Sequence, residues 1–446
     1  MNLIAIASLF SQPCAMSAEV TSYGIDSRTL QAGSLFIAIP GEQFDGHDFV
    51  KEAEAKGAVA AIVDHQVSGV KIPQIVVPDT IKALAKIATA YRREIHCPVV
   101  ALTGSNGKTS VKEMIASILP QPAHATKGNL NNHLGAPLSV LQLKPAHRYA
   151  VFELGANHSG EIAHTVSIVQ PDVTLINNIA PAHIEGFGSI DGVARAKGEI
   201  HQGLTAHGTA VVNDDDAYSH FWDGILADKR VLRFSLNKST ADVYAKDIRI
   251  DTTGRGHFSL VLPKGQVEVE LQVPGEHNIR NALAAATCCY ALGIAIPDIQ
   301  RGLNEFTGVK GRMTVLQGKN HSTVIDDTYN ANLRSVVTAL EVLSKRPGKK
   351  IFVFGDMGEL GEWATQHHEE VGLTAKQLGI NELMTCGKFS QLSSQSFGPG
   401  GEHFASQDKL AQNVIEKLNS DTTVLVKGSR SSAMEKIVQK LLIDAV

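Results

Sequence analysis

The segment VVALTGSNGKTS, residues 99–110, has the residue types and the spacing of a phosphate-binding loop. An apolar run leads into two glycines, Gly104 and Gly107, and a helical pattern follows. Glycine lets backbone N–H groups turn toward an anion without a Cβ clash, and the N-terminus of the following helix favours negative charge. Lys108 is then expected to bind β- and γ-phosphates, and the Thr109 hydroxyl to bind Mg²⁺.

This loop is a variant of the general pattern Gly-x-x-x-x-Gly-Lys-[Ser/Thr]. Leu102 stands where the first glycine belongs, and Gly104 follows two residues later. An ordinary strand–helix turn with an exposed lysine is the alternative, but the order of strand, loop and helix favours a phosphate site. Two other glycine-containing turns are less specific: GDMGELG (355–361) lacks the dinucleotide-binding spacing, and KGSRSS (427–432) fits an ordinary basic loop equally well.

Candidate metal ligands stand at the ends of two apolar runs. Glu153 ends the run YAVFEL (149–154), and His183 lies a few residues after VTLINNI (173–179). The carboxyl ends of parallel strands meet at one edge of a sheet, where ligands bind, so both side chains are expected near the phosphate loop. They are candidate Mg²⁺ ligands, with ordinary loop residues as the alternative. Lys197 has the pattern of a solvated helical lysine.

Two asparagine-rich segments allow a structural or a binding role. Asn131 and Asn132 lie in NLNNHLGAP (129–137), where asparagine side chains either form turns or hydrogen-bond to sugars and peptides. Asn278 and Asn281 lie in HNIRNALAA (277–285), where they either contact an adenine edge or cap the helix.

The elements that must position these residues follow an α/β pattern. Short apolar runs alternate with helical patterns such as 80–95 and 108–119, which predicts parallel sheets with crossover helices. Residues 240–274 alternate polar and apolar and predict antiparallel strands, and the N-terminal stretch 1–15 predicts a strand or a short helix. The predicted strands are 60–64, 74–78, 98–103, 149–154, 173–179, 209–213, 322–328, 350–355 and 423–428.

Length and composition set limits on the class of protein. A chain of 446 residues predicts about three domains, which we place at 1–83, 84–313 and 314–446. With 43% hydrophobic and 19% charged residues, wholesale disorder is excluded. The net charge of -4 argues against nucleic acid as a partner. Five cysteines without a CxxC pair argue against a disulfide framework or a zinc cluster. The most apolar long segment, 282–296, is too short to span a membrane, so we expect a soluble cytoplasmic protein.

Taken together, these motifs resemble the Mur ligases, the ATP-dependent amino-acid and peptide ligases of peptidoglycan precursor synthesis. The resemblance runs from about residue 24 to residue 432. It rests on TGSNGKTS, FELGAN, NIAPAHIEGFG with AKGEI, PGEHNIRNALAA, the Gly311–Arg312 pair and DDTYNAN. It implies three α/β domains: an N-terminal UDP-sugar-binding domain, a central parallel-sheet P-loop ATPase domain and a C-terminal Rossmann-like ligase domain.

Within that family the sequence is most similar to the branch that adds D-alanyl-D-alanine to UDP-N-acetylmuramoyl-tripeptide. The supporting segments are DSR (26–28), GSLFIAIPGEQFDGHDF (33–49), GNLNNHLGAP, DDTYNAN and FGDMGELG. His133 and Leu333 depart from the family pattern at positions that bear on substrate contacts rather than on the nucleotide.

The resemblance also implies roles for individual residues. Lys108, Glu153, His183 and Lys197 are implied to be catalytic. Thr109, Glu153, His183 and, as a carbamate, Lys197 are implied to hold metal. The implied ATP-binding residues are Gly104, Ser105, Asn106, Gly107, Lys108, Thr109, Ser110, Asn278, Asn281, Arg312 and Asp327. The implied contacts to the UDP substrate are Ser27, Arg28, Asn131 and Asn132.

The implied reaction uses ATP and Mg²⁺ to turn a peptide carboxylate into an acyl phosphate, which the amine of D-alanyl-D-alanine attacks. The expected partners are therefore small molecules, and we expect a monomer without a membrane span. The alternatives are a folylpolyglutamate- or cyanophycin-type ligase, a P-loop regulatory ATPase, or a UDP-sugar-binding module with an inactive nucleotide site. Whether the third residue of the stem peptide is diaminopimelate or lysine stays open.

Overall fold

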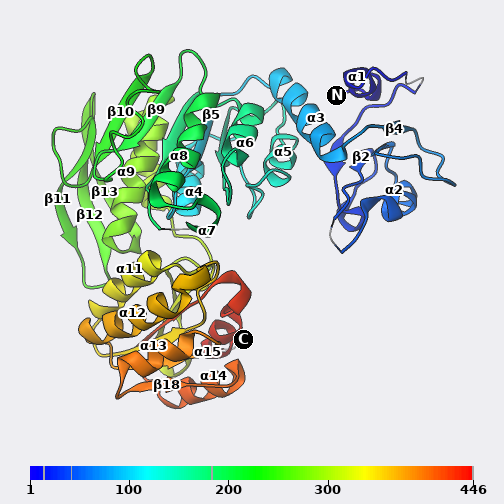
Figure 1. The fold of residues 1–446 in the computed structure, drawn as a ribbon. Coiled ribbons are helices and arrows are strands. Elements are labelled where there is room, and N and C mark those ends of the chain that lie inside the picture. The colour runs from blue at the N-terminus through cyan, green and yellow to red at the C-terminus, as the bar shows by residue number, and fades with distance from the viewer. Residues whose placement is uncertain (14–15, 42, 182–183, 444–446) are drawn as a thin grey trace.

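The computed structural model describes residues 1–13, 16–41, 43–181 and 184–443. Its described residues form three separate β-sheets in chain order, each with helices packed on it (Figure 1). The expected α/β architecture is therefore confirmed. No helix of this described part of the chain is both long and apolar enough to cross a membrane.

The first sheet is entirely parallel, in the order β1-β2-β3-β4. Its strands are β1 (Ser22–Gly24), β2 (Ser34–Ile37), β3 (Ala60–Val63) and β4 (Gln74–Val76), and its helices are α1 (Leu3–Leu9) and α2 (Val50–Ala55). The N-terminal stretch is thus the short helix that was one of the two predictions. Helix α3 (Thr80–Glu94) leads into the central domain and packs on α5 (Gly135–Val140) and α6 (Glu161–Val169) of that domain. The predicted domain limit at residue 83 falls inside α3.

The central sheet has nine strands in the order β13-β12-β11-β10-β9-β8-β5-β7-β6. Its parallel part comprises β5 (Val99–Thr103), β6 (Ala123–Ala125), β7 (Tyr149–Glu153), β8 (Val173–Ile176), β9 (Thr209–Asn213) and β10 (Arg230–Ser235), and β11 (Val243–Ile250) joins β10 in parallel. The antiparallel strands β12 (Arg255–Leu262) and β13 (Gly265–Pro274) extend it, as the alternation in 240–274 predicted.

Helices cover both faces of the parallel part, which is why its strands read as continuous apolar runs. Along β5, Val99 and Ala101 face one core, and Val100 and Leu102 face the other, because successive side chains point to opposite faces. The first core includes residues of α5 (Gly135–Val140), α6 (Glu161–Val169) and α8 (Ile190–Gly198); the second includes α4 (Lys108–Ile118), α9 (Glu276–Ala291) and α10 (Ile296–Glu305).

The third sheet has the order β14-β15-β19-β16-β17-β18, parallel except where β14 pairs with β15. Its strands are β14 (Thr314–Gln317), β15 (Thr323–Asp327), β16 (Lys349–Phe354), β17 (Glu382–Thr385), β18 (Gly401–His403) and β19 (Thr422–Lys427). Its helices are α11 (Leu333–Ser344), α12 (Ala364–Gln377), α13 (Ser390–Phe397), α14 (Gln407–Glu416) and α15 (Glu435–Leu441). In Figure 1 this domain lies below the central domain, and the N-terminal domain extends from the end of α3.

Seven of the nine predicted strands end one to three residues earlier than predicted, and one of these differences matters for the site. The run VTLINNI was predicted as strand to residue 179, but β8 ends at Ile176. Asn177 and Asn178 leave the sheet because their polar groups bond to the phosphate-loop segment. Likewise β15 ends at Asp327, one residue before the predicted end.

Candidate nucleotide and ligation site

The phosphate loop forms as the sequence predicts, between β5 and α4. Gly104 has a φ of +152° and Gly107 a left-handed φ of +78° as the residue that caps α4. A Cβ on Gly107 would lie 2.6 Å from Asn177 Nδ2 and 2.7 Å from Asn281 Oδ1. Glycine is therefore required at position 107 both by backbone conformation and by space.

Asparagine side chains from distant segments hold the loop in shape. The Asn106 backbone N–H donates to Asn178 Oδ1 at 2.9 Å, and its carbonyl accepts from Asn177 Nδ2 at 3.0 Å. Asn177 Nδ2 also donates to Asn281 Oδ1 at 3.1 Å, and Asn332 Nδ2 donates to Asn106 Oδ1 at 2.8 Å. Elements separated by up to 226 residues thus fix one turn of backbone before any ligand binds.

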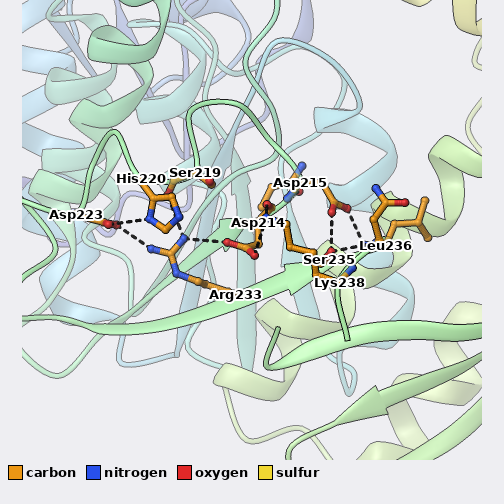
Figure 2. Close-up of polar contacts among 11 residues, drawn as sticks. Asp214, Asp215, Ser219, His220, Asp223, Arg233, Ser235, Leu236 and Lys238 are labelled. Atoms are coloured by element: carbon orange, nitrogen blue, oxygen red, sulfur yellow. Dashed lines mark hydrogen bonds and ion pairs between the residues drawn. The ribbon is translucent and has the colours of Figure 1, made fainter. Parts of the chain in front are cut away.

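The end of β9 and the turn that follows it form hydrogen bonds with the Asn177–Ile179 segment. Asn213 Nδ2 donates to the Asn177 carbonyl and Asp216 Oδ2 accepts from the Ile179 N–H, both at 2.9 Å. Figure 2 shows the polar network that holds this turn against β10. Its contacts join Arg233 to Asp214 and Asp223, Lys238 to Asp214, and Asp215 to Ser235 and to the backbone N–H of Leu236. This network is structural: it positions the segment that positions the loop.

Cationic side chains converge on the loop from two segments of the chain. Lys108 Nζ donates to the Gly104 carbonyl at 2.7 Å. Burial lowers the pKa of Lys108; the charge of Arg312 lowers it further, and Glu153 opposes the shift. Arg312 lies in the connection between α10 and β14, at the border of the central and C-terminal domains; it donates to Thr109 Oγ1 at 2.9 Å and stacks 4.0 Å from the centroid of the Tyr329 ring. Such a cluster suits a polyphosphate.

Glu153 lies beside the loop because β7 pairs with β5 in a register that places it opposite Leu102. The side chain is 3% exposed; Oε1 accepts from Asn131 Nδ2 at 2.9 Å, and Oε2 is a buried atom without a hydrogen-bond partner. A buried carboxylate oxygen without a partner is unfavourable, and a cation would compensate it; hydroxyl and carboxylate oxygens such as those of Thr109 and Glu153 are the ligands that Mg²⁺ prefers. The residues present therefore fit a magnesium ion.

Of the two other residues predicted to bind metal, the structure describes only one. His183 lies outside the described residues. Lys197 is 1% exposed on α8, and burial, together with the charge of Lys108, holds its pKa well below the ordinary value. Its Nζ is 6.0 Å from the centroid of the Phe187 ring. Lys197 is thus a deeply buried amine with a reduced tendency to carry charge, not the solvated lysine that its sequence pattern suggested.

A cavity of about 490 Å³ is lined by Lys108, Glu153 and Arg312, whereas Thr109 and Lys197 are not among its described lining residues. It lies between the central and C-terminal domains, and several of its lining side chains have buried atoms without a partner, namely Asn106 Nδ2, Glu153 Oε2, Arg280 Nε and Arg312 Nε. Buried polar groups are normally satisfied, so a concentration of unsatisfied ones in a cavity indicates a polar ligand. The volume is in the range of small-molecule sites.

The adenine-side candidates and the C-terminal candidates also line this cavity. Asn278 and Asn281 are both buried at the start of α9, and Asn281 Nδ2 donates to Asn278 Oδ1 at 3.2 Å. Asp327 ends β15, forms an ion pair with the buried Lys427 and accepts the Met313 N–H at 3.2 Å. Arg334 Nη1 donates to the Ile179 carbonyl at 3.1 Å, a second contact between the two domains.

The residues predicted to contact a UDP substrate are divided between two places. Asn131 and Asn132 line the cavity. Ser27 is buried in the N-terminal domain, where its carbonyl accepts from Lys56 Nζ at 3.0 Å. Arg28 is exposed, and its guanidinium forms two hydrogen bonds with the Asp26 carboxylate, at 2.9 and 2.7 Å. Neither of these two belongs to the described lining of the cavity.

Several cavity residues were not predicted as site residues: Asn178, His277, Arg280, Tyr329, Asn332, Arg334 and Lys427. Helical spacing could have found two of them, since positions 277, 280 and 281 share one face of α9. Burial lowers the pKa of His277 to about 4, against the charge of Asp327. The others come from loops whose proximity only the tertiary fold creates.

Comparison with known proteins places this fold and site in a class. Models of the Mur ligase family match along the chain: the family's catalytic-domain model at residues 19–92, the Mur ligase middle domain at 102–289 and the Mur ligase glutamate ligase domain at 311–430. The chain belongs to the Mur ligase family, whose members at this level of similarity are ligases.

Its relatives point to one branch of the family. The UDP-N-acetylmuramoyl-tripeptide--D-alanyl-D-alanine ligase of Escherichia coli (strain K12) is 44% identical, over 93% of this chain and 92% of the relative. The ligase of the same name from Haemophilus influenzae is 39% identical over 95% and 94%. Among solved structures, MurF from Acinetobacter baumannii has a TM-score of 0.89 at 37% identity and covers 97% of this chain and 95% of its own. MurF ligase from Thermotoga maritima, in complex with ADP, has a TM-score of 0.81 at 27% identity, over 94% and 97%.

Proposed function

We propose that this chain joins D-alanyl-D-alanine to the C-terminal carboxylate of UDP-N-acetylmuramoyl-tripeptide, with ATP converted to ADP and phosphate, to give the pentapeptide precursor of peptidoglycan. The observation that carries the proposal is an unsatisfied Glu153 oxygen in the same cavity that Lys108 of the phosphate loop lines. The near full-length relatives that bear this activity in their names support the choice of substrates.

The chemistry follows from the poor reactivity of a carboxylate toward an amine. A carboxylate oxygen attacks the γ-phosphorus of ATP, and the bond to the leaving ADP oxygen breaks. Lys108 and Arg312 neutralise charge on the phosphoryl oxygens as it spreads in the transition state. The amine of D-alanyl-D-alanine then attacks the acyl carbon, loses a proton and expels phosphate. Both cations are buried or half-buried, so their effect is stronger than it would be in water.

Magnesium, which Thr109 and Glu153 would hold, supplies additional positive charge to the phosphates when bound. We propose that His183 and Lys197 complete the metal side of the site, with Lys197 reacting with carbon dioxide to form a carbamate. Burial lowers the pKa of Lys197 well below its ordinary value, which increases the share of uncharged amine, the form that adds to carbon dioxide and then releases a proton.

The remaining assignments are also proposals. Ser105, Asn106 and Ser110 would contact phosphates together with the loop glycines, while Asn278 and Asn281 would contact the adenine side and Asp327 the nucleotide from the C-terminal domain. Ser27 and Arg28 would bind the UDP moiety, and the Asn131–Asn132 loop would face the muramoyl peptide.

The wider context is proposed on the same basis. The enzyme would act in the cytoplasm as a monomer, with domain limits near residues 83 and 313. Because water would hydrolyse an acyl phosphate, the three domains should close over it during the reaction.

The test is an ADP-release assay in which each substrate is omitted in turn. We expect ADP only when UDP-N-acetylmuramoyl-tripeptide and D-alanyl-D-alanine are both present, and little turnover with the corresponding dipeptide acceptor. Turnover with folate or with an aspartate polymer would identify a different ligase, and ATP hydrolysis independent of both substrates would identify a regulatory ATPase.

A further inference from the structure

We propose that Asn131 is a positioning residue that holds the Glu153 carboxylate in the orientation in which it accepts magnesium. The inference rests on the proposed function and adds to it a specific task for the asparagine-rich loop 129–137. The competing role for the Asn131 side chain is direct contact with the UDP substrate.

The contact itself divides the carboxylate into two unlike oxygens. Asn131 Nδ2 donates to Glu153 Oε1 at 2.9 Å, whereas Glu153 Oε2 is buried without a partner. Both side chains line the cavity that Lys108 also lines. An amide that satisfies one oxygen leaves the other as the acceptor that a hard cation would complete.

Asn131 can do this because its own backbone is fixed against the end of β7. Its N–H donates to the Asn129 carbonyl at 2.7 Å, and its carbonyl accepts from the Gly155 N–H at 2.9 Å. A Cβ on Gly155 would lie 3.2 Å from Asn131 Cγ, so the amide packs directly on the backbone two residues after Glu153. The amide and the carboxylate therefore belong to one rigid unit.

Glu153 is anchored from its other side as well. Its backbone N–H donates to Thr126 Oγ1 at 3.1 Å, and the Thr126 carbonyl accepts from the buried Lys112 Nζ at 2.6 Å. These contacts fix the backbone position of Glu153, and the Asn131 amide fixes the position of its Oε1 atom. Without the Asn131 amide, the carboxylate can rotate about its terminal bond, which lowers the fraction of time that Oε2 points into the cavity.

The experiment measures how strongly magnesium promotes nucleotide binding, independently of catalysis. The affinity of the full-length protein for a fluorescent ADP analogue is titrated in excess Mg²⁺ and in EDTA. Asn131→Ala and Asn131→Leu, which has nearly the size of asparagine without its polar atoms, should reduce the gain from Mg²⁺ by about tenfold, as expected for loss of a contact behind a metal ligand. Their affinity in EDTA should equal that of the wild type, which also shows that the variants are folded.

Two controls separate positioning from a general effect. Lys127→Ala removes an exposed side chain two residues before the same loop, outside the cavity lining, and should leave the gain from Mg²⁺ unchanged. In a Glu153→Gln background, Asn131→Ala should cause no further loss, because the two residues act through one contact. Equal losses for Lys127→Ala and Asn131→Ala, or additive losses in the double variant, would overturn the proposal.

A separate outcome concerns the competing role. If Asn131→Ala keeps the full gain from Mg²⁺ but raises the KM for the UDP substrate, Asn131 is a substrate contact and the positioning role is refuted. Failure of the proposed function can be distinguished from failure of the positioning role, because the wild-type protein itself would then catalyse no ligation.

Discussion

Replacement of Lys108 by methionine tests the role of the phosphate loop. We expect this variant to lose much of its activity while its stability changes little. The ammonium group is in direct contact with the loop backbone, with Nζ 2.7 Å from the Gly104 carbonyl oxygen. Removing one preorganised donor from a transition state with developing charge typically costs about 3–4 kcal/mol, or roughly 10²- to 10³-fold in kcat. Arg312 would remain at Thr109, so we expect a loss in this range rather than total inactivity.

The same substitution should hardly affect folding. Burial lowers the pKa of Lys108, which means that the folded protein disfavours its charged form. Methionine removes that unfavourable burial and loses a single hydrogen bond, worth about 1 kcal/mol, so the apparent Tm should change little.

Lys112→Met is the matched control, since Lys112 is a fully buried lysine one turn later on α4. It leaves the Thr126 carbonyl without its donor and Glu113 without its ion pair, so this variant should lower the apparent Tm clearly. Steady-state ADP release and thermal unfolding measure both quantities. The reasoning is refuted if Lys108→Met keeps kcat within about threefold of the wild type, or if it unfolds as readily as Lys112→Met.

Three further predictions concern other parts of the site and the core. Gly107→Ala forces a Cβ against Asn177 and Asn281 at a left-handed φ, and should weaken nucleotide binding at least about tenfold by calorimetry; unchanged affinity would show that the loop is not preformed. Lys197→Met should abolish any stimulation of ligation by bicarbonate, and a variant that keeps full activity in bicarbonate-depleted buffer would contradict the carbamate. Burial lowers the pKa of His201 to about 4, so between pH 6.5 and about 4 the unfolded chain binds a proton that the folded chain does not. The free energy of unfolding should therefore fall as the pH is lowered through that range, by roughly 3 kcal/mol in the limit. His201→Leu should flatten the dependence of the apparent Tm on pH, and an unchanged slope would assign the effect to other groups.

Much of the fold could be predicted from local pattern alone. The doubly covered sheet produces runs such as PVVALT and YAVFEL, because residues on both faces of each strand are buried. The phosphate loop could be predicted because its requirements are local: Gly107 must be left-handed, and Lys108 and Thr109 must begin a helix. Glu153 could be placed at the same edge because the register of parallel strands follows from their chain direction.

What the pattern could not predict depends on contacts between distant segments. Asn177 and Asn178 read as the end of a strand, yet they leave the sheet to bond to Asn106, 71 and 72 residues away. From the sequence, Lys197 was interpreted as a solvated helical lysine because Arg195 and Glu199 are its charged neighbours, and its burial arises from packing against other segments. Arg334 meets Ile179 only because two domains face each other.

The most direct test of the central claim follows the oxygen atoms of the peptide carboxylate. If the terminal carboxylate of UDP-N-acetylmuramoyl-tripeptide is labelled with ¹⁸O and the enzyme is supplied with ATP and D-alanyl-D-alanine, each turnover should transfer one labelled oxygen to the inorganic phosphate, because the acyl phosphate breaks between the acyl carbon and that oxygen. Phosphate that carries no label while amide is formed would contradict the account.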